Sequence, residues 1–283
     1  CGQPQCTESG LSADFTLFAF VFQAHCPNVF TISLRPHNVQ KASAVAIPKI
    51  IHQTYASVQV APEIARNIER LKAMNPGWQH AFYDDAAIEA FIRRYYDLDM
   101  LALYQRINPA YGAARADFFR YLLVYQFGGV YLDIKSTALQ PLDTLIAPQD
   151  RYVLAYWPNA QGEPFEGWGL YEALPEFPRG EFQNWHIMAE PHHPFLRGVI
   201  AQVITNIRAY SVDVYGVGQL GVLRTTGPFA YTHGIRPYLN SCPHRLAGSH
   251  VDLGLAYSML QGDSHKQLFK AHYTALSEPV VLP

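Results

Sequence analysis

The residues from 115 to 137 constrain the fold of this chain more than any other stretch. Apolar side chains recur there at a helical spacing, which predicts a helix with one buried stripe up to Phe127. Gly128 and Gly129 follow and end the helix, as a left-handed C-cap would. The residues from 130 to 134 are rich in β-branched and aromatic side chains and predict a short strand. The sequence therefore predicts a helix that turns directly into a strand.

Three charged side chains come together if that strand runs back along the helix. Asp117 and Arg120 are three residues apart, so their side chains lie together on the polar side of an early helical turn. The helix climbs about 16 Å from Asp117 to Gly128, and the strand returns about 13 Å from Gly129 to Asp133. Asp133 would then lie beside Asp117 and Arg120 at the carboxyl end of a strand, where open α/β sheets bind ligands. The alternative is a surface ion pair without a function.

Strand and helix patterns alternate along the first part of the chain that shows regular periodicity. An apolar run at 47–53 predicts a strand, and Pro62 marks the start of a helix. Residues 78–83 predict a second strand, after which Asp84 or Asp85 caps another helix. This order predicts an α/β fold built around a doubly wound sheet.

Composition and spacing exclude several other classes of protein. The 21 basic and 23 acidic side chains nearly cancel, and no basic stripe indicates a nucleic-acid partner. Residues 216–221 spell G-x-G-x-x-G, but the context of the dinucleotide fingerprint is missing, so a glycine-rich loop is predicted there. The apolar run at 15–22 is far shorter than the roughly 20 residues that span a bilayer. Because the chain begins with Cys1, membrane association through a missing upstream anchor stays open.

The central motif resembles a known sugar-nucleotide site. The sequence R-A-D-F-F-R-Y-L-L-V-Y-Q-F-G-G-V-Y-L-D-I from residue 115 is similar to the site of DXD-type glycosyltransferases. The closest resemblance is to family 32, which includes yeast-type initiating α-1,6-mannosyltransferases and bacterial capsular sugar transferases. The clostridial glucosylating toxins share the same core. Residues 47–54 (I-P-K-I-I-H-Q-T), 193–196 (H-P-F-L) and 226–228 (T-G-P) resemble further landmarks of the family.

This resemblance implies the GT-A fold. We therefore expect a single Rossmann-like nucleotide-sugar-binding domain, an α/β structure whose mixed, mostly parallel sheet is flanked by helices. The resemblance covers roughly residues 47–283, which we expect to form the glycosyltransferase domain. Residues 1–46 lack a clear period and end in a polar, small stretch, so they are predicted to be an N-terminal appendage or linker.

The resemblance also implies roles for the charged residues of the motif. We expect Asp133, Asp117 and Arg120 to be the catalytic group. The aspartate that matches Asp133 in related enzymes contacts ribose and sugar hydroxyls, and the residues that match Asp117 and Arg120 grip the sugar. The residue that matches Tyr131 lies near the nucleoside. Carboxylate and guanidinium groups suit hydroxyl recognition because charge-assisted hydrogen bonds are short and directional.

Two segments outside the motif are implied as further parts of the donor site. Gln53 and Thr54, at the end of the first predicted strand, would lie beside the nucleotide. Asn184, in Q-N-W-H, falls where the family often has Asn-Asp facing the transferred sugar, although the second position here is Trp185.

Lys135 is the main departure from the family pattern. The usual motif is D-x-D, whose last aspartate binds a divalent metal on the diphosphate, whereas this chain has Asp133-Ile134-Lys135. The ammonium of Lys135 could bind the diphosphate and replace the metal. Alternatively, Mn²⁺ or Mg²⁺ binds through Asp133 and a C-terminal group such as His272, or the chain binds its ligand without turnover. We expect a working enzyme. Whether it uses a metal is left open, but the otherwise intact site favours metal use.

The sequence thus predicts a retaining glycosyltransferase that moves mannose, galactose or glucose from a GDP- or UDP-hexose to a glycan or lipid-linked acceptor. No dedicated carboxylate nucleophile is evident, so we expect a front-face displacement. A glycoside hydrolase would use two carboxyl groups about 5 to 10 Å apart, but Arg120 would lower the pKa of both Asp117 and Asp133 and leave no protonated acid. The remaining alternative is an inactive nucleotide-sugar or carbohydrate-binding module. Residence in the cytoplasm, at a membrane surface or in the Golgi lumen depends on the missing anchor.

Overall fold

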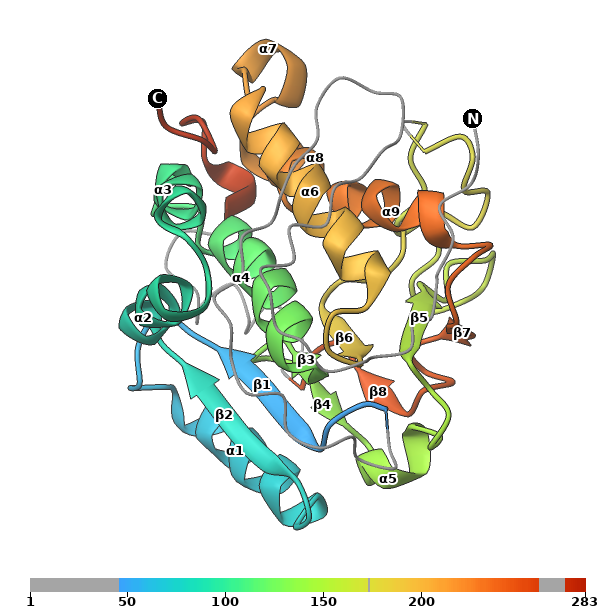
Figure 1. Ribbon diagram of the computed structural model, residues 1–283. Coiled ribbons are helices and arrows are strands. Elements are labelled where there is room, and N and C mark those ends of the chain that lie inside the picture. The colour runs from blue at the N-terminus through green and yellow to red at the C-terminus, as the bar shows by residue number, and fades with distance from the viewer. Residues whose placement is uncertain (1–45, 173, 260–272) are drawn as a thin grey trace, which may run out of the picture.

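The computed structural model describes residues 46–172, 174–259 and 273–283 (Figure 1). Its main sheet has six strands in the order β2-β1-β3-β6-β5-β7. Strand β6 runs antiparallel to β3 and β5, and the other neighbouring pairs are parallel. These strands are β1 (Ile50–Thr54), β2 (Gln79–Tyr83), β3 (Gly129–Leu132), β5 (Tyr152–Tyr156), β6 (His186–Ala189) and β7 (Arg245–Ser249). The predicted α/β class with a mixed, mostly parallel sheet is confirmed.

The sheet separates two hydrophobic cores, because successive side chains of a strand point to opposite faces. In β3, for example, Tyr131 belongs to one core, whereas Val130 and Leu132 belong to the other. Helices α2 (Asp85–Tyr95), α3 (Leu98–Arg106), α4 (Gly112–Phe127), α6 (Pro194–Arg208), α8 (Gly218–Thr225) and α9 (Pro228–Ile235) cover the first face. Helices α1 (Pro62–Met74) and α5 (Leu142–Leu145) and the small sheet of β4 (Thr137–Ala138) and β8 (Leu255–Ala256) cover the second.

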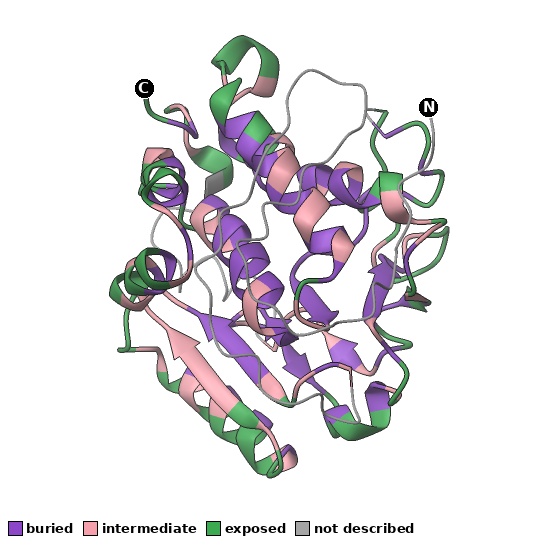
Figure 2. Ribbon diagram, in the orientation of Figure 1, coloured by how far each residue is buried: buried purple, intermediate pink, exposed green. Residues whose placement is uncertain are grey.

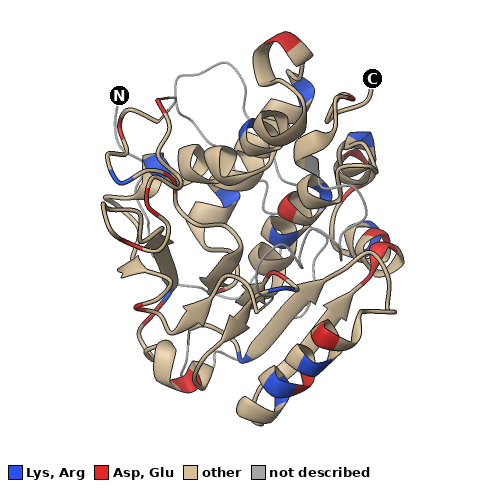
Figure 3. Ribbon diagram, turned by 180° about the vertical axis from the view of Figure 1, so that it is seen from behind, with Lys and Arg blue, Asp and Glu red and all other residues tan. Residues whose placement is uncertain are grey.

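The remaining elements are short. They are the helix α7 (Val212–Tyr215) and the 3-10 turns η1 (Arg236–Tyr238) and η2 (Tyr273–Ala275). Charged residues are frequent along α1, whereas the strands of the sheet carry few of them (Figure 3).

Helix α4 and strand β3 form the helix–strand unit that the sequence predicts. Gly128 and Gly129 have φ of 63° and 97°, which only glycine adopts readily, so the chain reverses there within two residues. A Cβ on Gly128 would lie 2.7 to 2.8 Å from atoms of Pro191 and Pro48, so this position also has no room for a side chain.

One detail of the predicted helix was wrong. The sequence predicted a single buried stripe with Asp117 and Arg120 on a polar side. Instead α4 is buried almost all round, because the sheet lies on one side of it and α2, α3, α6 and α8 on the others (Figure 2). Asp117 and Arg120 are themselves buried, with exposed fractions of 6% and 4%. Charged groups in that position need partners, since an unpaired buried charge is costly.

Other local predictions can be checked against the described residues. Pro62 begins α1, and the side chain of Asp84 caps α2 by accepting from the backbone N–H of Ala87 at 2.8 Å. The glycine-rich residues 216–221 do not form the predicted loop, because they run from the end of α7 into the first turn of α8. A helix and not a strand precedes them, so the dinucleotide fingerprint is absent there.

The two-part division of the chain stays a prediction, because residues 1–45 lie outside the described part. Among the helices of the described residues, none combines the length and the apolar character needed to cross a bilayer.

Candidate functional site

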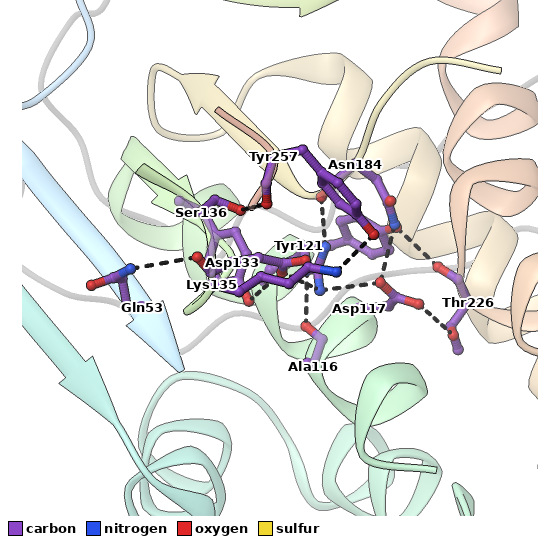
Figure 4. A network of polar contacts seen from close by, with 12 residues as sticks. Gln53, Ala116, Asp117, Tyr121, Asp133, Lys135, Ser136, Asn184, Thr226 and Tyr257 are labelled. Carbon is purple, nitrogen blue, oxygen red and sulfur yellow. Dashed lines mark hydrogen bonds and ion pairs between the residues drawn. The ribbon is translucent and has the colours of Figure 1, made fainter. Parts of the chain in front are cut away.

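The site lies where β3 ends and α4 begins, on the side of the sheet to which the carboxyl ends of β1 and β3 point (Figure 4). Beyond β3 the chain makes a tight turn, in which the N–H of Ser136 donates to the carbonyl of Asp133 at 2.8 Å. The N–H of Asp133 in turn donates to the carbonyl of Trp185 at 2.9 Å, just before β6. The turn that carries Asp133 and Lys135 is therefore fixed to the middle of the sheet.

Arg120 is the centre of the polar network. Its guanidinium lies 2.9 Å from Asp133 Oδ1 and 3.3 Å from Asp117 Oδ1, and it donates to the carbonyl of Asn184 at 2.7 Å. The same group lies 4.7 Å from the centre of the Tyr131 ring. The predicted convergence of two carboxylates and a guanidinium is thus present. Burial opposes the charge of Arg120, but the surrounding carboxylates raise its pKa above the ordinary value, so it stays protonated.

Asp117 is held from three sides. Beside Arg120, the amide of Asn184 donates to its Oδ1 at 3.0 Å and the hydroxyl of Thr226 donates to its Oδ2 at 3.2 Å. Burial raises the pKa of Asp117 to about 6, against the opposing effect of Arg120. Arg120 lowers the pKa of Asp117 as predicted, but the predicted net lowering was wrong, because the loss of hydration outweighs the neighbouring cation. Both oxygens of Asp117 are occupied, which makes it an anchor for the site.

Asp133 is the most exposed of the three charged groups. Its side chain is 23% accessible, compared with 8% for Asp117 and 5% for Arg120. Its Oδ1 also accepts from the hydroxyl of Tyr131 at 3.3 Å. Arg120 and Tyr131 therefore fix the orientation of the Asp133 carboxylate, and the exposed part of this group is open to a ligand.

The predicted residues of β1 and the segment before β6 take different positions. The amide of Gln53 donates to the backbone carbonyl of Asp133 at 3.5 Å, and its oxygen pairs with His80 at 2.9 Å, so Gln53 borders the site. The hydroxyl of Thr54 is instead used to donate to the carbonyl of Tyr83 at 2.9 Å. The amide of Asn184 is used within the network, where it also contacts the hydroxyl of Tyr121 at 2.8 Å.

Lys135 lies beside an aromatic residue that the sequence analysis did not select. Its ammonium donates to the hydroxyl of Tyr257 at 2.7 Å and lies 4.0 Å from the centre of that ring. Burial lowers the pKa of Lys135, an effect that the charge of Asp133 opposes and that of Arg120 adds to. Tyr257 follows β8 and is separated from Lys135 by 122 positions, so no local pattern could have connected the two.

Comparison with known proteins places this geometry in a family. Residues 61–152, which include the helix–strand unit and the turn after it, match the model of the glycosyltransferase sugar-binding region containing the DXD motif. The chain thus contains the sugar-binding region of this glycosyltransferase family.

Curated relatives of the chain agree with this match. The chain is 31% identical over 183 residues to the initiation-specific alpha-1,6-mannosyltransferase of Candida albicans. The alignment covers 59% of the chain and 46% of that protein. It is 26% identical over 192 residues to the inositol phosphoceramide mannosyltransferase 3 of Schizosaccharomyces pombe, covering 68% of the chain and 46% of that protein. The chain thus spans about half the length of the curated relatives it matches.

Solved structures show a more distant likeness. The PaToxG glycosyltransferase is similar with a TM-score of 0.48 at 17% identity, over 69% of this chain and 70% of that one. The glycosyltransferase domain of the YGT toxin, solved with UDP bound, has the same TM-score at 8% identity, over 73% of this chain and 80% of that one. These values are too low to add to the argument on function.

Members of the DXD-motif family typically depend on a metal, so the fit of this site to a divalent cation matters. The described residues contain no group of three or more His, Cys, Asp or Glu side chains that could hold a metal ion. Asp133 is paired with Arg120, and the position of the last DXD aspartate carries the cation Lys135. Of the two predicted metal ligands, Asp133 is thus already paired with Arg120 and His272 lies outside the described residues, so the metal site stays a prediction.

Proposed function

We propose that this chain transfers a hexose, mannose in the first place, from a nucleotide-diphosphate sugar to a hydroxyl group of a glycan or glycolipid. The observation that carries the proposal is the Arg120 network, in which two carboxylates and a guanidinium converge at the end of β3 within the family's sugar-binding region. The names of the curated relatives, which are mannosyltransferases, favour mannose over glucose or galactose.

Asp133 is the group that meets the donor. Its carboxylate is oriented by Arg120 and Tyr131 and remains partly exposed, so it can accept hydrogen bonds from ribose or sugar hydroxyls. Asp117 and Asn184 hold Arg120 and each other, which keeps the guanidinium in one place without requiring reorganisation when the donor binds. In this proposal Asp117 acts through Arg120 and is a positioning residue.

The charge balance of the site supports a role for Lys135 on the diphosphate. Arg120 and Lys135 together balance the two carboxylates of Asp117 and Asp133. An aspartate at position 135 would instead leave an excess of two negative charges, which a divalent cation would balance. Lys135 thus supplies from the chain itself the positive charge that stabilises the leaving diphosphate.

We further propose that the transfer retains the anomeric configuration. The bond from the anomeric carbon to the phosphate oxygen breaks while the acceptor oxygen bonds to that carbon on the same face, and the acceptor's proton passes to the leaving phosphate. Asp117 is a poor nucleophile for a covalent intermediate, because both of its oxygens accept hydrogen bonds. A glycosyl group trapped on a carboxylate of the enzyme would contradict this route.

The test is a donor-hydrolysis and transfer screen with GDP-mannose, UDP-glucose and UDP-galactose, each with Mn²⁺ or with EDTA. We expect turnover of one donor that survives EDTA. Lys135→Asp should make turnover dependent on Mn²⁺, whereas the control Lys72→Asp, on the exposed surface of α1, should behave as wild type.

Three results would contradict parts of this proposal. Wild-type turnover that EDTA abolishes would remove the role given to Lys135. Recovery of activity only in Lys135→Asp would mean that the natural chain binds a nucleotide sugar without turnover. A product with inverted anomeric configuration, read by NMR, would exclude the front-face route.

A further inference from the structure

Trp168 is a large aromatic residue that the network around Arg120 does not use, and 49% of its surface is exposed. Leu170 and Tyr171, close to it in the sequence, are 44% and 36% exposed. A single exposed apolar side chain is ordinary on a protein surface, whereas a group of them often marks an interaction site. The segment 158–180 therefore calls for a ligand or partner with an apolar face.

The sheet places Trp168 at the same edge as the donor network. Strands β3 and β5 both run antiparallel to β6, which lies between them, so their carboxyl ends meet at one edge. Asp133 directly follows β3, and Trp157 directly follows β5. The Trp168 ring packs on that of Trp157, with 5.2 Å between the ring centres. The segment 158–180 thus brings Trp168 back to the edge that carries Asp133.

Tyr257 connects Trp168 to Lys135. The centre of the Tyr257 ring lies 4.0 Å from the Lys135 ammonium (Figure 4) and 6.2 Å from the centre of the Trp168 ring. The Trp168 ring is therefore no farther from the ammonium than 6.2 Å plus 4.0 Å. Asp133, Lys135 and Tyr257 are all partly exposed, so accessible side chains lead from the donor network to the indole.

Neighbouring groups hold the Trp168 indole in place. The ring of Phe165 lies 5.2 Å from it, at an interplanar angle of 71°. The N–H of Trp168 donates to the carbonyl of Phe165 at 2.9 Å, and the amide of Asn159 donates to the carbonyl of Trp168 at 2.7 Å. A side chain that is already ordered loses little conformational entropy when a ligand binds. Trp168 is therefore suited to recognition although it is exposed.

The order of the strands indicates which part of the reaction reaches Trp168. Gln53 borders the donor network from β1, on one side of β3, whereas Trp157 follows β5, on the other side. In the proposed function the nucleotide lies beside Gln53 and the diphosphate meets Lys135. The group that reaches Trp168 is then the sugar that receives the hexose. A pyranose ring has a face of C–H groups, and such a face packs well on an aromatic ring.

We propose that Trp168 is the platform on which the acceptor sugar stacks, and that it is a specificity-determining residue of the transferase. This inference rests on the proposed function, from which it takes the position of the donor. An acceptor sugar on the indole lies beside the hexose carried on the diphosphate, so one of its hydroxyl groups can reach the anomeric carbon. Water needs no such platform, and hydrolysis of the donor is therefore independent of Trp168.

The test compares Trp168→Leu, which keeps apolar bulk without an aromatic face, with Trp168→Tyr, which keeps such a face. The acceptors are methyl α-mannoside and methyl β-galactoside, each with the donor that wild type hydrolyses among GDP-mannose, UDP-glucose and UDP-galactose. We expect Trp168→Leu to raise the acceptor KM about tenfold, with kcat, donor hydrolysis and the affinity for the nucleoside diphosphate unchanged. Trp168→Tyr should stay within roughly threefold of wild type.

Trp78→Leu is the matched control. Trp78 directly precedes β2, which runs parallel to β1, so it lies at the opposite edge of the sheet. The same substitution there should leave the acceptor KM unchanged.

Oxidation of the wild-type protein gives a second measurement, which does not depend on the folding of a variant. N-bromosuccinimide oxidises accessible indoles, and mass spectrometry of the peptides identifies the modified residue. A saturating acceptor glycoside should protect Trp168 and leave the oxidation of the partly exposed Trp78 unchanged.

The outcomes separate this inference from the proposed function. An unchanged acceptor KM in folded Trp168→Leu overturns the inference, as does oxidation of Trp168 at the same rate with and without acceptor. Weaker binding of the nucleoside diphosphate to Trp168→Leu would also overturn it, because the indole would then contact the nucleotide. Hydrolysis of a donor without transfer to either glycoside would exclude a sugar as the acceptor. Absence of donor hydrolysis by wild type would instead overturn the proposed function, on which the inference rests.

Discussion

Replacement of Arg120 by Met should destabilise the protein by an amount that depends on pH. The side chain keeps its apolar length, but the contacts to Asp117, Asp133 and the Asn184 carbonyl are lost. Removal of one partner from a buried ion pair costs about 3–5 kcal/mol, because the other charge stays buried without compensation. Asp133 is 23% exposed and can regain water, so most of the cost falls on the buried Asp117.

The pH dependence follows from the carboxyl group that is left behind. The pKa of Asp117 is about 6 with Arg120 present, and it rises further when Arg120 is removed. A carboxyl whose pKa is raised in the folded state loses stability as the pH rises toward that pKa and regains it as the pH falls, at about 1.4 kcal/mol per unit. We therefore expect a destabilisation of about 4 kcal/mol at pH 8 and roughly 2 kcal/mol less at pH 5.5.

The assay is urea unfolding followed by tryptophan fluorescence at both pH values. Arg66→Met is the matched control, since Arg66 pairs with Glu63 at 3.1 Å on the surface with exposed fractions of 71% and 46%. It should change the free energy of unfolding by less than about 1 kcal/mol at either pH. An equal loss of stability at pH 5.5 and pH 8 in Arg120→Met would refute the reasoning, because it would show that Asp117 does not carry the cost.

Three further results are expected. Affinity for GDP should fall as the pH rises toward 10.5, the ordinary pKa of lysine, because burial lowers the pKa of Lys135 and the ammonium loses its proton below that pH. Calorimetry at several pH values measures the affinity. The affinity of Lys135→Arg should not change with pH, and a fall in that variant would contradict the role given to Lys135. Thr226→Val should cost about 1–3 kcal/mol in urea unfolding, since it leaves Oδ2 of buried Asp117 unpaired, and an unchanged midpoint would show that another group replaces the hydroxyl. Gly128→Ala should lower the melting temperature far more than Gly162→Ala: both have positive φ, 63° and 81°, but a Cβ meets prolines at 2.7 to 2.8 Å in the first and nothing within 4 Å in the second. Similar shifts for the two glycine variants would mean that backbone strain and not crowding limits position 128.

Local sequence was sufficient for the centre of the site. Asp117 and Arg120 lie in α4 and Asp133 directly follows β3, so the rise per residue of the helix and the strand determined that they would meet. The same local reasoning misjudged the surroundings of α4. A run of apolar residues with two embedded charges reads as amphipathic, whereas the charges here are buried and paired with each other.

Partners that come from distant segments could not be predicted in the same way. Thr226 was selected only as part of a family landmark, and its hydrogen bond to Asp117 joins positions 109 apart. Tyr257 was not selected at all, because one tyrosine among 18 carries no local signal. Trp168 lies in a stretch without periodicity, and only the contact of its ring with that of Tyr257 connects it to the site.

The long separations within the Arg120 network have a consequence for folding. The hydrogen bonds from Thr226 to Asp117 and from Lys135 to Tyr257 close loops of 109 and 122 positions, so most of the chain must be synthesised before either can form. Contacts of this kind are slow to form because the loop entropy is lost before the contact is gained. We therefore expect the helix–strand unit of α4 and β3 to form early with Arg120 still unpartnered by Asn184. The complete binding site would then arise only in the last, cooperative step, so that a nascent chain has no competent site before its C-terminal third has docked.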